Sequence, residues 1–269
     1  MFLKIYAVLS VLIESIICLF TDIISGLEDL WVPIVLFLGI FVAFLVFHLL
    51  VMVIASLLVN KKKPCPKPNR FYKLLLDYTA EIAMSIMRVK VVANGFEKLP
   101  SDKRFLLVSN HRSSFDPIAT IPQVMKFDVA FISKPENFRI PIASEIIHKC
   151  CYLPIDRDNA RNAMRTIHSA TEFVKNNILS VAVYPEGTRS KTDELLEFKD
   201  GVFYIAKKSP CPIVIMTVNG TEKIKKNFPF RKTVIHLDVL KVLEIESFID
   251  KSTHEISEEV KGIMLENLK

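Results

Sequence analysis

The sequence lacks the motifs of several large enzyme classes. It has neither a Gly-x-Ser-x-Gly nucleophile turn nor a Gly-rich P-loop ending in Gly-Lys, which argues against an α/β-hydrolase and against a nucleotide-driven enzyme. Its five cysteines form no Cys-x-x-Cys pair and have no metal-ligand spacing with the six histidines. We therefore expect free thiols in a reducing compartment and no metal site.

Charged residues are absent from one long segment. Residues 31–59 contain no Asp, Glu, Lys or Arg, and a helix of this length exceeds the roughly 30 Å hydrocarbon core of a bilayer. With 51% hydrophobic residues overall, the chain is more apolar than an ordinary soluble domain. The segment therefore predicts a membrane helix, in which His48 is expected at a helix–helix contact or at the membrane interface.

The preceding segment, residues 1–25, has a different pattern. Its polar side chains fall on one side of a helical wheel, which predicts an amphipathic helix. Such a helix either lies in the membrane surface or pairs with the following helix as a hairpin that hides the polar stripe. A single Lys near the start and the lack of a small-x-small site argue against a cleaved signal peptide. The stripe consists of Lys4, Ser10, Glu14, Ser15, Cys18, Thr21, Asp22 and Ser25.

A basic, proline-rich linker follows the apolar segment. Residues 61–73, KKKPCPKPNRFYK, hold six basic side chains and no acid, so the positive-inside rule predicts that this end is cytoplasmic. Each Lys near an anionic membrane surface contributes about 1 kcal/mol, although the run serves equally well as a topology signal alone. The net charge of +6 therefore predicts an anionic membrane surface as partner. Because no aromatic residues are interleaved in the manner of nucleic-acid binders, we expect no nucleic-acid partner.

Beyond the linker, short apolar strands alternate with helices. We expect strands at residues 104–109, 129–133, 179–184, 212–218 and 234–242, and helices at 70–87, 117–125, 141–149, 158–177, 201–208 and 254–268. This order predicts an α/β fold with a mostly parallel sheet flanked by helices, preceded by an N-terminal membrane helix pair. The predicted division is 1–60 for the membrane segment, 61–73 for the linker and 74–269 for the α/β domain. The basic run 223–232 is expected to be a solvated loop, with membrane contact as the alternative.

The motif NHRSSFDP, residues 110–117, follows the first of these strands. On one helix, the spacing of His111 and Asp116 would place their side chains roughly 140° apart. A strand, a loop and then a helix capped by Asp116, with Pro117 as its first residue, would let the two meet. The carboxylate would then fix the imidazole tautomer and leave the other nitrogen to take a proton from a hydroxyl. The alternative is a plain helix cap and an ordinary polar loop residue.

A second motif, VAVYPEGTRS at residues 181–190, repeats the layout of an apolar strand followed by a charged turn. Glu186, Thr188 and Arg189 gather around Gly187, and an Arg fork with hydroxyls and backbone amides is suited to gripping a phosphate. The carboxyl ends of strands meet at one edge of such a sheet, so this turn and His111 are expected to lie together. A plain surface loop is the alternative.

Two further cations are candidates for the same phosphate. Arg157 follows an apolar stretch, where it reaches an anion or forms an ordinary salt bridge. Lys199, in the FKDG segment at 198–201, faces either the phosphate or water. We expect both to assist Arg189.

Four segments, in this order, resemble the lysophospholipid and glycerophosphate acyltransferase family, the group that contains bacterial 1-acylglycerol-3-phosphate acyltransferase. NHRSSFD matches the family's HxxxxD block, IDR at 155–157 its second block, YPEGTRS its third, and CPIVI at 211–215 its fourth. The first and third blocks together are highly specific, and the likeness covers roughly residues 90–220. Cys151, Pro154 and Ile215 depart from the usual second and fourth blocks. These regions shape the acceptor and acyl pockets in the family, so the departures bear on the acceptor rather than on the reaction type.

The resemblance implies a membrane-bound acyltransferase of phospholipid synthesis. Such an enzyme moves a fatty acyl group from acyl-CoA or acyl carrier protein to the free hydroxyl of 1-acyl-sn-glycerol 3-phosphate, a membrane lipid, and gives phosphatidic acid. The resemblance implies His111 as general base and Asp116 as its orienting partner, with no cofactor beyond the thioester co-substrate. The residues expected at the acceptor phosphate are Arg189, Glu186, Gly187, Thr188, Arg157 and Lys199.

Other functions are compatible with the same residues. Glycerol 3-phosphate or a zwitterionic lysophospholipid would be acylated by the same chemistry, although the first needs no membrane anchor and the second has less need of clustered arginines. A non-catalytic adaptor would bind lipid phosphates through residues 61–73 and Arg189. The adaptor would tolerate His111→Ala, whereas an acyltransferase should lose at least about 10²-fold in rate. The loop at 134–141 is a candidate wall for an apolar acyl tunnel.

Overall fold

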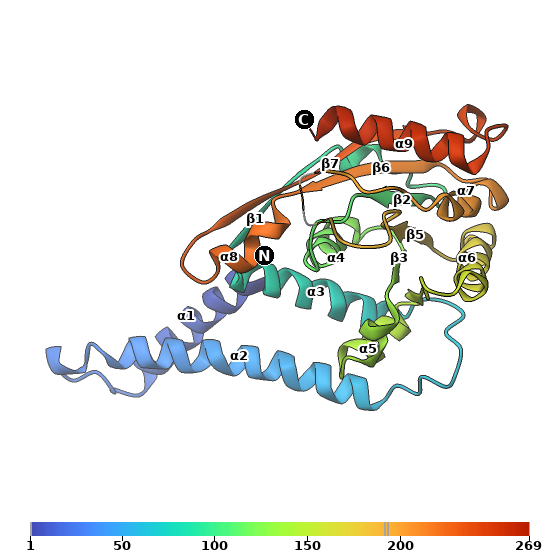
Figure 1. The fold of residues 1–269 in the computed structure, drawn as a ribbon. Coiled ribbons are helices and arrows are strands. Elements are labelled where there is room, and N and C mark those ends of the chain that lie inside the picture. The colour runs from blue at the N-terminus through green and yellow to red at the C-terminus, as the bar shows by residue number, and fades with distance from the viewer. Residues whose placement is uncertain (1, 191, 193, 269) are drawn as a thin grey trace. The chain divides into compact units, whose positions relative to one another are not determined.

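The structure, a computed structural model, describes residues 2–190, 192 and 194–268. The chain divides into two compact units, residues 1–59 and residues 60–269. The first unit holds helix α1 (Phe2–Phe20), the short 3-10 turn η1 (Leu27–Asp29) and helix α2 (Val32–Leu57) (Figure 1). Both helices are long and apolar enough to cross a membrane.

The two helices of the first unit pack against each other as a hairpin (Figure 1). The Tyr6 ring stacks on Phe44 with 5.3 Å between the ring centroids, and the Tyr6 hydroxyl lies 3.4 Å from His48 Nδ1. His48 therefore makes a helix–helix contact. The structure has the hairpin arrangement, but the hairpin does not hide the polar stripe. Only Ser10 of the stripe is buried, whereas five of its members are exposed: Lys4, Ser15, Thr21, Asp22 and Ser25.

The second unit is built on a mostly parallel sheet. In the part of the chain that the structure describes, seven strands have the order β1-β7-β6-β2-β5-β3-β4, and only β6 and β7 run antiparallel. The strands are β1 (Val89–Asn94), β2 (Leu106–Ser109), β3 (Val129–Ser133), β4 (Leu153–Pro154), β5 (Ser180–Val183), β6 (Ile213–Asn219) and β7 (Thr233–Leu243). The helices are α3 (Arg70–Ile86), α4 (Asp116–Thr120), α5 (Ala143–Lys149), α6 (Ala160–Lys175), α7 (Tyr204–Lys208), α8 (Ile224–Asn227) and α9 (Thr253–Asn267).

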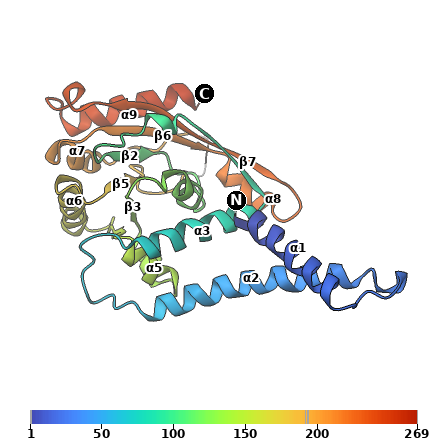
Figure 2. The same cartoon turned by 180° about the vertical axis from the view of Figure 1, so that it is seen from behind.

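Helices cover both faces of this sheet (Figures 1 and 2). Alternate side chains of a strand point to opposite faces. Leu106 and Val108 of β2 accordingly join a buried cluster with α6, α7 and α9, whereas Leu107 joins another cluster with α3 and α4. Burial of both faces explains why the central strands read as continuous apolar runs. The predicted α/β fold is therefore confirmed.

The two edge strands are not predicted by the sequence. β1 pairs only with β7, and β4 pairs only with β3. Lys90 interrupts the apolar run of β1, and β4 is only two residues long, so neither segment has the sequence pattern of a strand. Both form strands because they pair with strands that are distant in the sequence. The run 223–232, expected to be a loop, also differs: it includes α8, whose Ile224 is fully buried.

The basic linker packs along the second unit. The Asn69 side chain caps α3 by accepting hydrogen bonds from Phe71 N and Tyr72 N, and Asn69 N donates to Lys149 O of α5 at 2.9 Å. Lys61 Nζ lies 2.6 Å from Glu145 Oε1. At least one cation of the linker is therefore engaged within this unit.

Candidate active site

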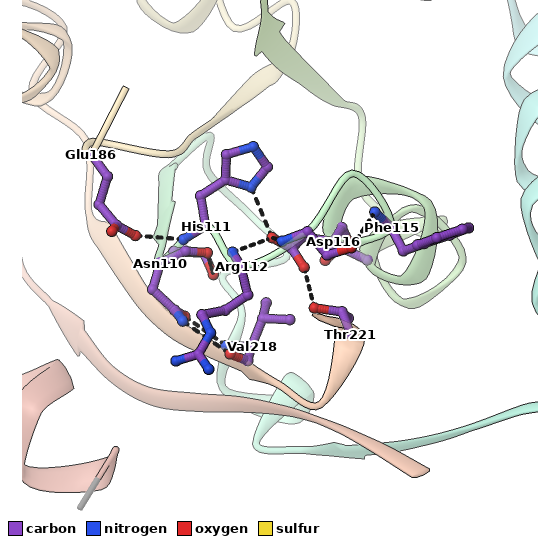
Figure 3. Close-up of polar contacts among 11 residues, drawn as sticks. Asn110, His111, Arg112, Phe115, Asp116, Glu186, Val218 and Thr221 are labelled. Atoms are coloured by element: carbon purple, nitrogen blue, oxygen red, sulfur yellow. Dashed lines mark hydrogen bonds and ion pairs between the residues drawn. The ribbon is translucent and has the colours of Figure 1, made fainter. Parts of the chain in front are cut away.

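Two polar residues follow β2 at the carboxyl edge of the sheet. Asn110 is fully buried and ties β2 to β6, because its Oδ1 accepts from Val218 N at 2.7 Å and its Nδ2 donates to Val218 O at 2.9 Å. His111 begins the loop that leads to α4, and its Nδ1 lies 2.8 Å from Asp116 Oδ2 (Figure 3). The turn thus brings together the His and the Asp of the first motif.

The Asp116 carboxylate is fully buried and receives donors from several sides. Oδ2 also accepts from Arg112 N at 2.7 Å and Ser113 N at 2.8 Å, and Oδ1 accepts from the Thr221 hydroxyl (Figure 3). Helix α4 begins at Asp116, with Phe115 at the N-cap position, so the predicted N-cap role of Asp116 is wrong. The tight turn before the helix needs an acceptor for its own amides, and the carboxylate turns back to supply it.

Glu186 joins the two loops of the site. Its side chain is buried, with Oε1 accepting from His111 N at 2.5 Å and Oε2 from Leu196 N at 2.9 Å. Ser190 N donates to His111 O at 2.9 Å, so both backbone polar groups of His111 are bonded to this turn. Burial raises the pKa of the Glu186 carboxyl, and the two amide donors oppose that effect. Glu186 therefore positions His111, because its oxygens are engaged by the backbone.

His111 opens onto a cavity of about 600 Å³. Its ring stacks on Tyr184 with 4.4 Å between centroids, and its Nε2 has no hydrogen-bond partner among the described residues. Most of the lining is apolar and comes from α3, α4, β3 and the 134–147 segment, which includes the loop predicted as a tunnel wall. These apolar side chains are Leu76, Pro117, Ile118, Ile121, Phe131, Ile132, Ile140, Ile147 and Tyr152.

Arg157 and Arg189 come from different loops and converge on this cavity, with Thr188 beside them. Partial burial lowers the pKa of the Arg157 guanidinium. Glu136 opposes that effect, and the positive charge of Arg189 adds to it. Two like charges this close repel each other, and a bound anion relieves the repulsion. The rim thus has the chemistry of a phosphate site.

A second cavity of about 650 Å³ shares Arg157 and Thr188 with the first. Lys199 and Gly187 line this second cavity and do not lie against the His111 cavity. Gly187 has a φ of +70°, a conformation that residues with a side chain rarely adopt, so glycine lets the turn form. Lys199 therefore shares a cavity with Arg157 and Thr188 but not with Arg189 or His111.

Three residues of the site are absent from the sequence prediction. Asn110 and Tyr184 lie inside the two motifs, so their position next to the predicted site residues could have identified them. Thr221 has no such signal, since it reaches Asp116 only because β6 lies beside β2. Among the described residues, no cluster of three or more His, Cys, Asp or Glu side chains is arranged to hold a metal ion.

The fold is shared with a solved acyltransferase. The crystal structure of the 1-acyl-sn-glycerophosphate acyltransferase PlsC from Thermotoga maritima is similar to this chain with a TM-score of 0.62, at 23% identity, over 99% of this chain and 98% of that chain. This likeness shows that the fold is a known one. The sequence match covers a shorter part of the chain. A family model described as Acyltransferase matches residues 90–219, which include both motifs.

Three curated relatives have names that describe the same acyltransferase. The chain is 30% identical to a 1-acyl-sn-glycerol-3-phosphate acyltransferase of Saccharomyces cerevisiae, over 67% of this chain and 60% of that protein. It is 34% identical to a chloroplastic one of Arabidopsis thaliana, over 59% and 44%, and 23% identical to one of Salmonella typhimurium, over 59% and 64%. The chain thus spans less than two thirds of each of these relatives. Residues 90–219 therefore belong to the acyltransferase family.

Proposed function

We propose that this chain transfers a fatty acyl group from an acyl thioester to the free hydroxyl of 1-acyl-sn-glycerol 3-phosphate, giving phosphatidic acid for phospholipid synthesis. The observation that carries the proposal is one cavity that is lined by His111, two arginines and apolar side chains, with Asp116 bonded to His111 from behind. The names of the relatives supply the acceptor.

The proposed reaction needs one proton to move twice. His111 Nε2 takes the proton of the acceptor hydroxyl while the hydroxyl oxygen attacks the thioester carbonyl carbon. Asp116 keeps the other proton on Nδ1 and stabilises the imidazolium as it forms. The tetrahedral intermediate then breaks its C–S bond, and His111 returns the proton to the leaving thiolate. The substrate hydroxyl is the nucleophile, so no acyl-enzyme forms and no cofactor beyond the thioester is used.

The rim of the cavity supports binding of the acceptor phosphate. Arg157 and Arg189 converge there, and Thr188 adds a hydroxyl. Guanidinium groups match phosphate oxygens in pairs, which fixes the lipid's orientation as well as its charge. In this proposal Glu186 and Gly187 shape the turn, and Lys199 assists from the neighbouring cavity. The apolar lining takes acyl chain.

The first unit supports a membrane location for this reaction. Both α1 and α2 are candidate membrane spans, and the acceptor and product are bilayer lipids. The basic run 61–73 favours the cytoplasmic side for the α/β unit. The thioester donor is then a cytoplasmic one, either acyl-CoA or acyl carrier protein.

Comparing wild type with His111→Ala tests the proposal. Each protein, in detergent, is given 1-acyl-sn-glycerol 3-phosphate with acyl-CoA or acyl carrier protein thioester, and phosphatidic acid and free thiol are followed. We expect equal amounts of both products from the wild type and at least about 10²-fold less from the variant. His236→Ala, an exposed histidine on β7, serves as the matched control and should keep full activity. Absence of product from folded wild type with either donor, or an unchanged rate in His111→Ala, would refute the proposal.

A further inference from the structure

The connection from α8 to β7 exposes aromatic side chains in a basic setting. Phe230 is 87% exposed and Phe228 38%. We call residues 223–232, which comprise α8 and the turn that follows it, the basic loop. The basic loop contains five cations and no acid, and none of its residues lines the cavity of His111. All five cations are exposed: Lys223, Lys225, Lys226, Arg231 and Lys232.

The basic loop is held in place by the rest of the α/β unit. Ile224, at its start, is fully buried in the core. Arg231 N donates to Asn227 O at 2.7 Å, and Arg88 Nη1 donates to Pro229 O at 3.2 Å. A bonded loop therefore displays Phe230, not a frayed chain end. Phe228, two residues away, is exposed as well, and exposed apolar side chains that are grouped and rimmed by polar residues indicate an interaction surface.

The surface around the loop also exposes basic and apolar side chains. β1 pairs with β7 so that Lys90 lies beside Val234; Lys90 is exposed, and Val234 is 45% exposed. Glu222 is the acid next to the loop, and its carboxylate lies 3.9 Å from Lys223 Nζ. The loop carries more positive charge than this single acid offsets.

We propose that the basic loop docks on an anionic lipid bilayer, with Phe228 and Phe230 at the headgroup level and the surrounding cations over the lipid phosphates. Aromatic rings favour the membrane–water interface, and basic side chains next to them are attracted by anionic lipids. The two candidate membrane helices of the first unit favour a location at such a surface. A purely apolar protein partner would not require five cations.

The sheet topology relates this surface to the site. β2 and β6 are parallel neighbours, so the loop after β6 leaves the sheet at the edge where His111 follows β2. That connection includes Thr221, whose hydroxyl donates to Asp116. Docking would thus bring a lipid surface to the catalytic edge of the sheet. The proposal concerns lipid contact alone and stands apart from the acyl transfer.

A single tryptophan makes the test direct. The chain has one Trp, Trp31, so Trp31→Phe with Phe230→Trp places the only indole at the loop tip. The full chain is placed in nanodiscs of phosphatidylcholine with or without phosphatidylglycerol, and emission is recorded with brominated lipids and with acrylamide. Leu265→Trp in the same background is the control, because Leu265 is 44% exposed on α9, and α9 packs on the opposite face of the sheet from Ile224 of the loop. Unfolding curves confirm that each variant is folded.

We expect brominated lipid to quench the indole at position 230 and not at 265, and a blue-shifted emission only with phosphatidylglycerol. Each Lys near the surface shifts the docking equilibrium by about fivefold, so adding Lys225→Glu and Lys226→Glu should shift it by at least about 25-fold and abolish the quenching. Equal quenching at both positions, no quenching at 230, or quenching independent of anionic lipid would overturn the proposal. Shielding from acrylamide without lipid quenching would also overturn it, since the loop would then be covered by protein. Acyl transfer, assayed on the same samples, reports separately on the proposed function.

Discussion

Asp116→Asn separates the charge of the catalytic pair from its geometry. In the native site, Asp116 Oδ2 accepts from His111 Nδ1 and from Arg112 N and Ser113 N, while Oδ1 accepts from the Thr221 hydroxyl. An asparagine has one oxygen, and two backbone N–H groups require it at the Oδ2 position. The amide nitrogen then faces Thr221, whose hydroxyl can accept in place of donating. The imidazole therefore keeps its tautomer and loses only its charged partner.

The expected decrease in rate follows from the loss of the negative charge on the hydrogen-bond partner of His111. A hydrogen bond to a charged group contributes about 1.5–3 kcal/mol and one to a neutral group about 0.5–1.5 kcal/mol. The difference of about 1–2 kcal/mol, applied to the transition state in which His111 is charged, corresponds to a rate about 5- to 30-fold lower. His111→Ala removes the base itself and should cost at least about 10²-fold.

The assay is kcat for phosphatidic acid formation by wild type, Asp116→Asn and His111→Ala under saturating substrates. Thermal unfolding of the same samples checks that the buried amide is tolerated. The expected order is wild type, then Asp116→Asn, then His111→Ala. If folded Asp116→Asn is as slow as His111→Ala, the amide has turned its nitrogen towards the imidazole, and the reasoning from the two backbone donors is wrong.

Three further predictions concern binding and stability. Glu186→Gln should lower stability by about 1–3 kcal/mol, seen as a lower melting temperature, and reduce kcat, because an amide cannot accept from both His111 N and Leu196 N; unchanged values would contradict its positioning role. Arg189→Ala should raise KM for the phosphate-bearing acceptor and leave KM for the thioester unchanged. If steady-state kinetics showed an equal rise in both KM values, the assignment of Arg189 to the acceptor phosphate would be wrong. Burial of the Asp77 carboxyl outweighs the attraction of Lys73 and raises its pKa to about 7. The unfolded chain releases that proton near pH 4, so the folded state loses stability as pH rises between about 4 and 7, by about 4 kcal/mol in all. Asp77→Asn should therefore raise the melting temperature most above pH 7 and less at pH 5; a gain that is the same at both pH values would exclude this carboxyl as the cause.

Several features of the protein follow from local patterns in its sequence. A charge-free run can only be solvated by lipid or by other apolar groups, so α2 is visible without a structure. The strand–loop–helix layout around NHRSSFD fixes where the chain turns, because apolar runs, a proline and polar loop residues each restrict the backbone locally. The alternation of short apolar strands with helices was sufficient to predict an α/β fold with a mostly parallel sheet.

Other features depend on which strands become neighbours. Thr221 reaches Asp116 because β6 lies beside β2, and Glu186 bonds the His111 backbone because β5 lies on the other side. Lys199, close to Glu186 in sequence, lines a different cavity from His111. Strand order is set by packing of both sheet faces across the whole domain. The sequence by itself therefore determined the long apolar helix, the fold class and the two motifs, whereas only the tertiary structure decided which polar groups satisfy the buried carboxylates and which cations share a cavity with the base.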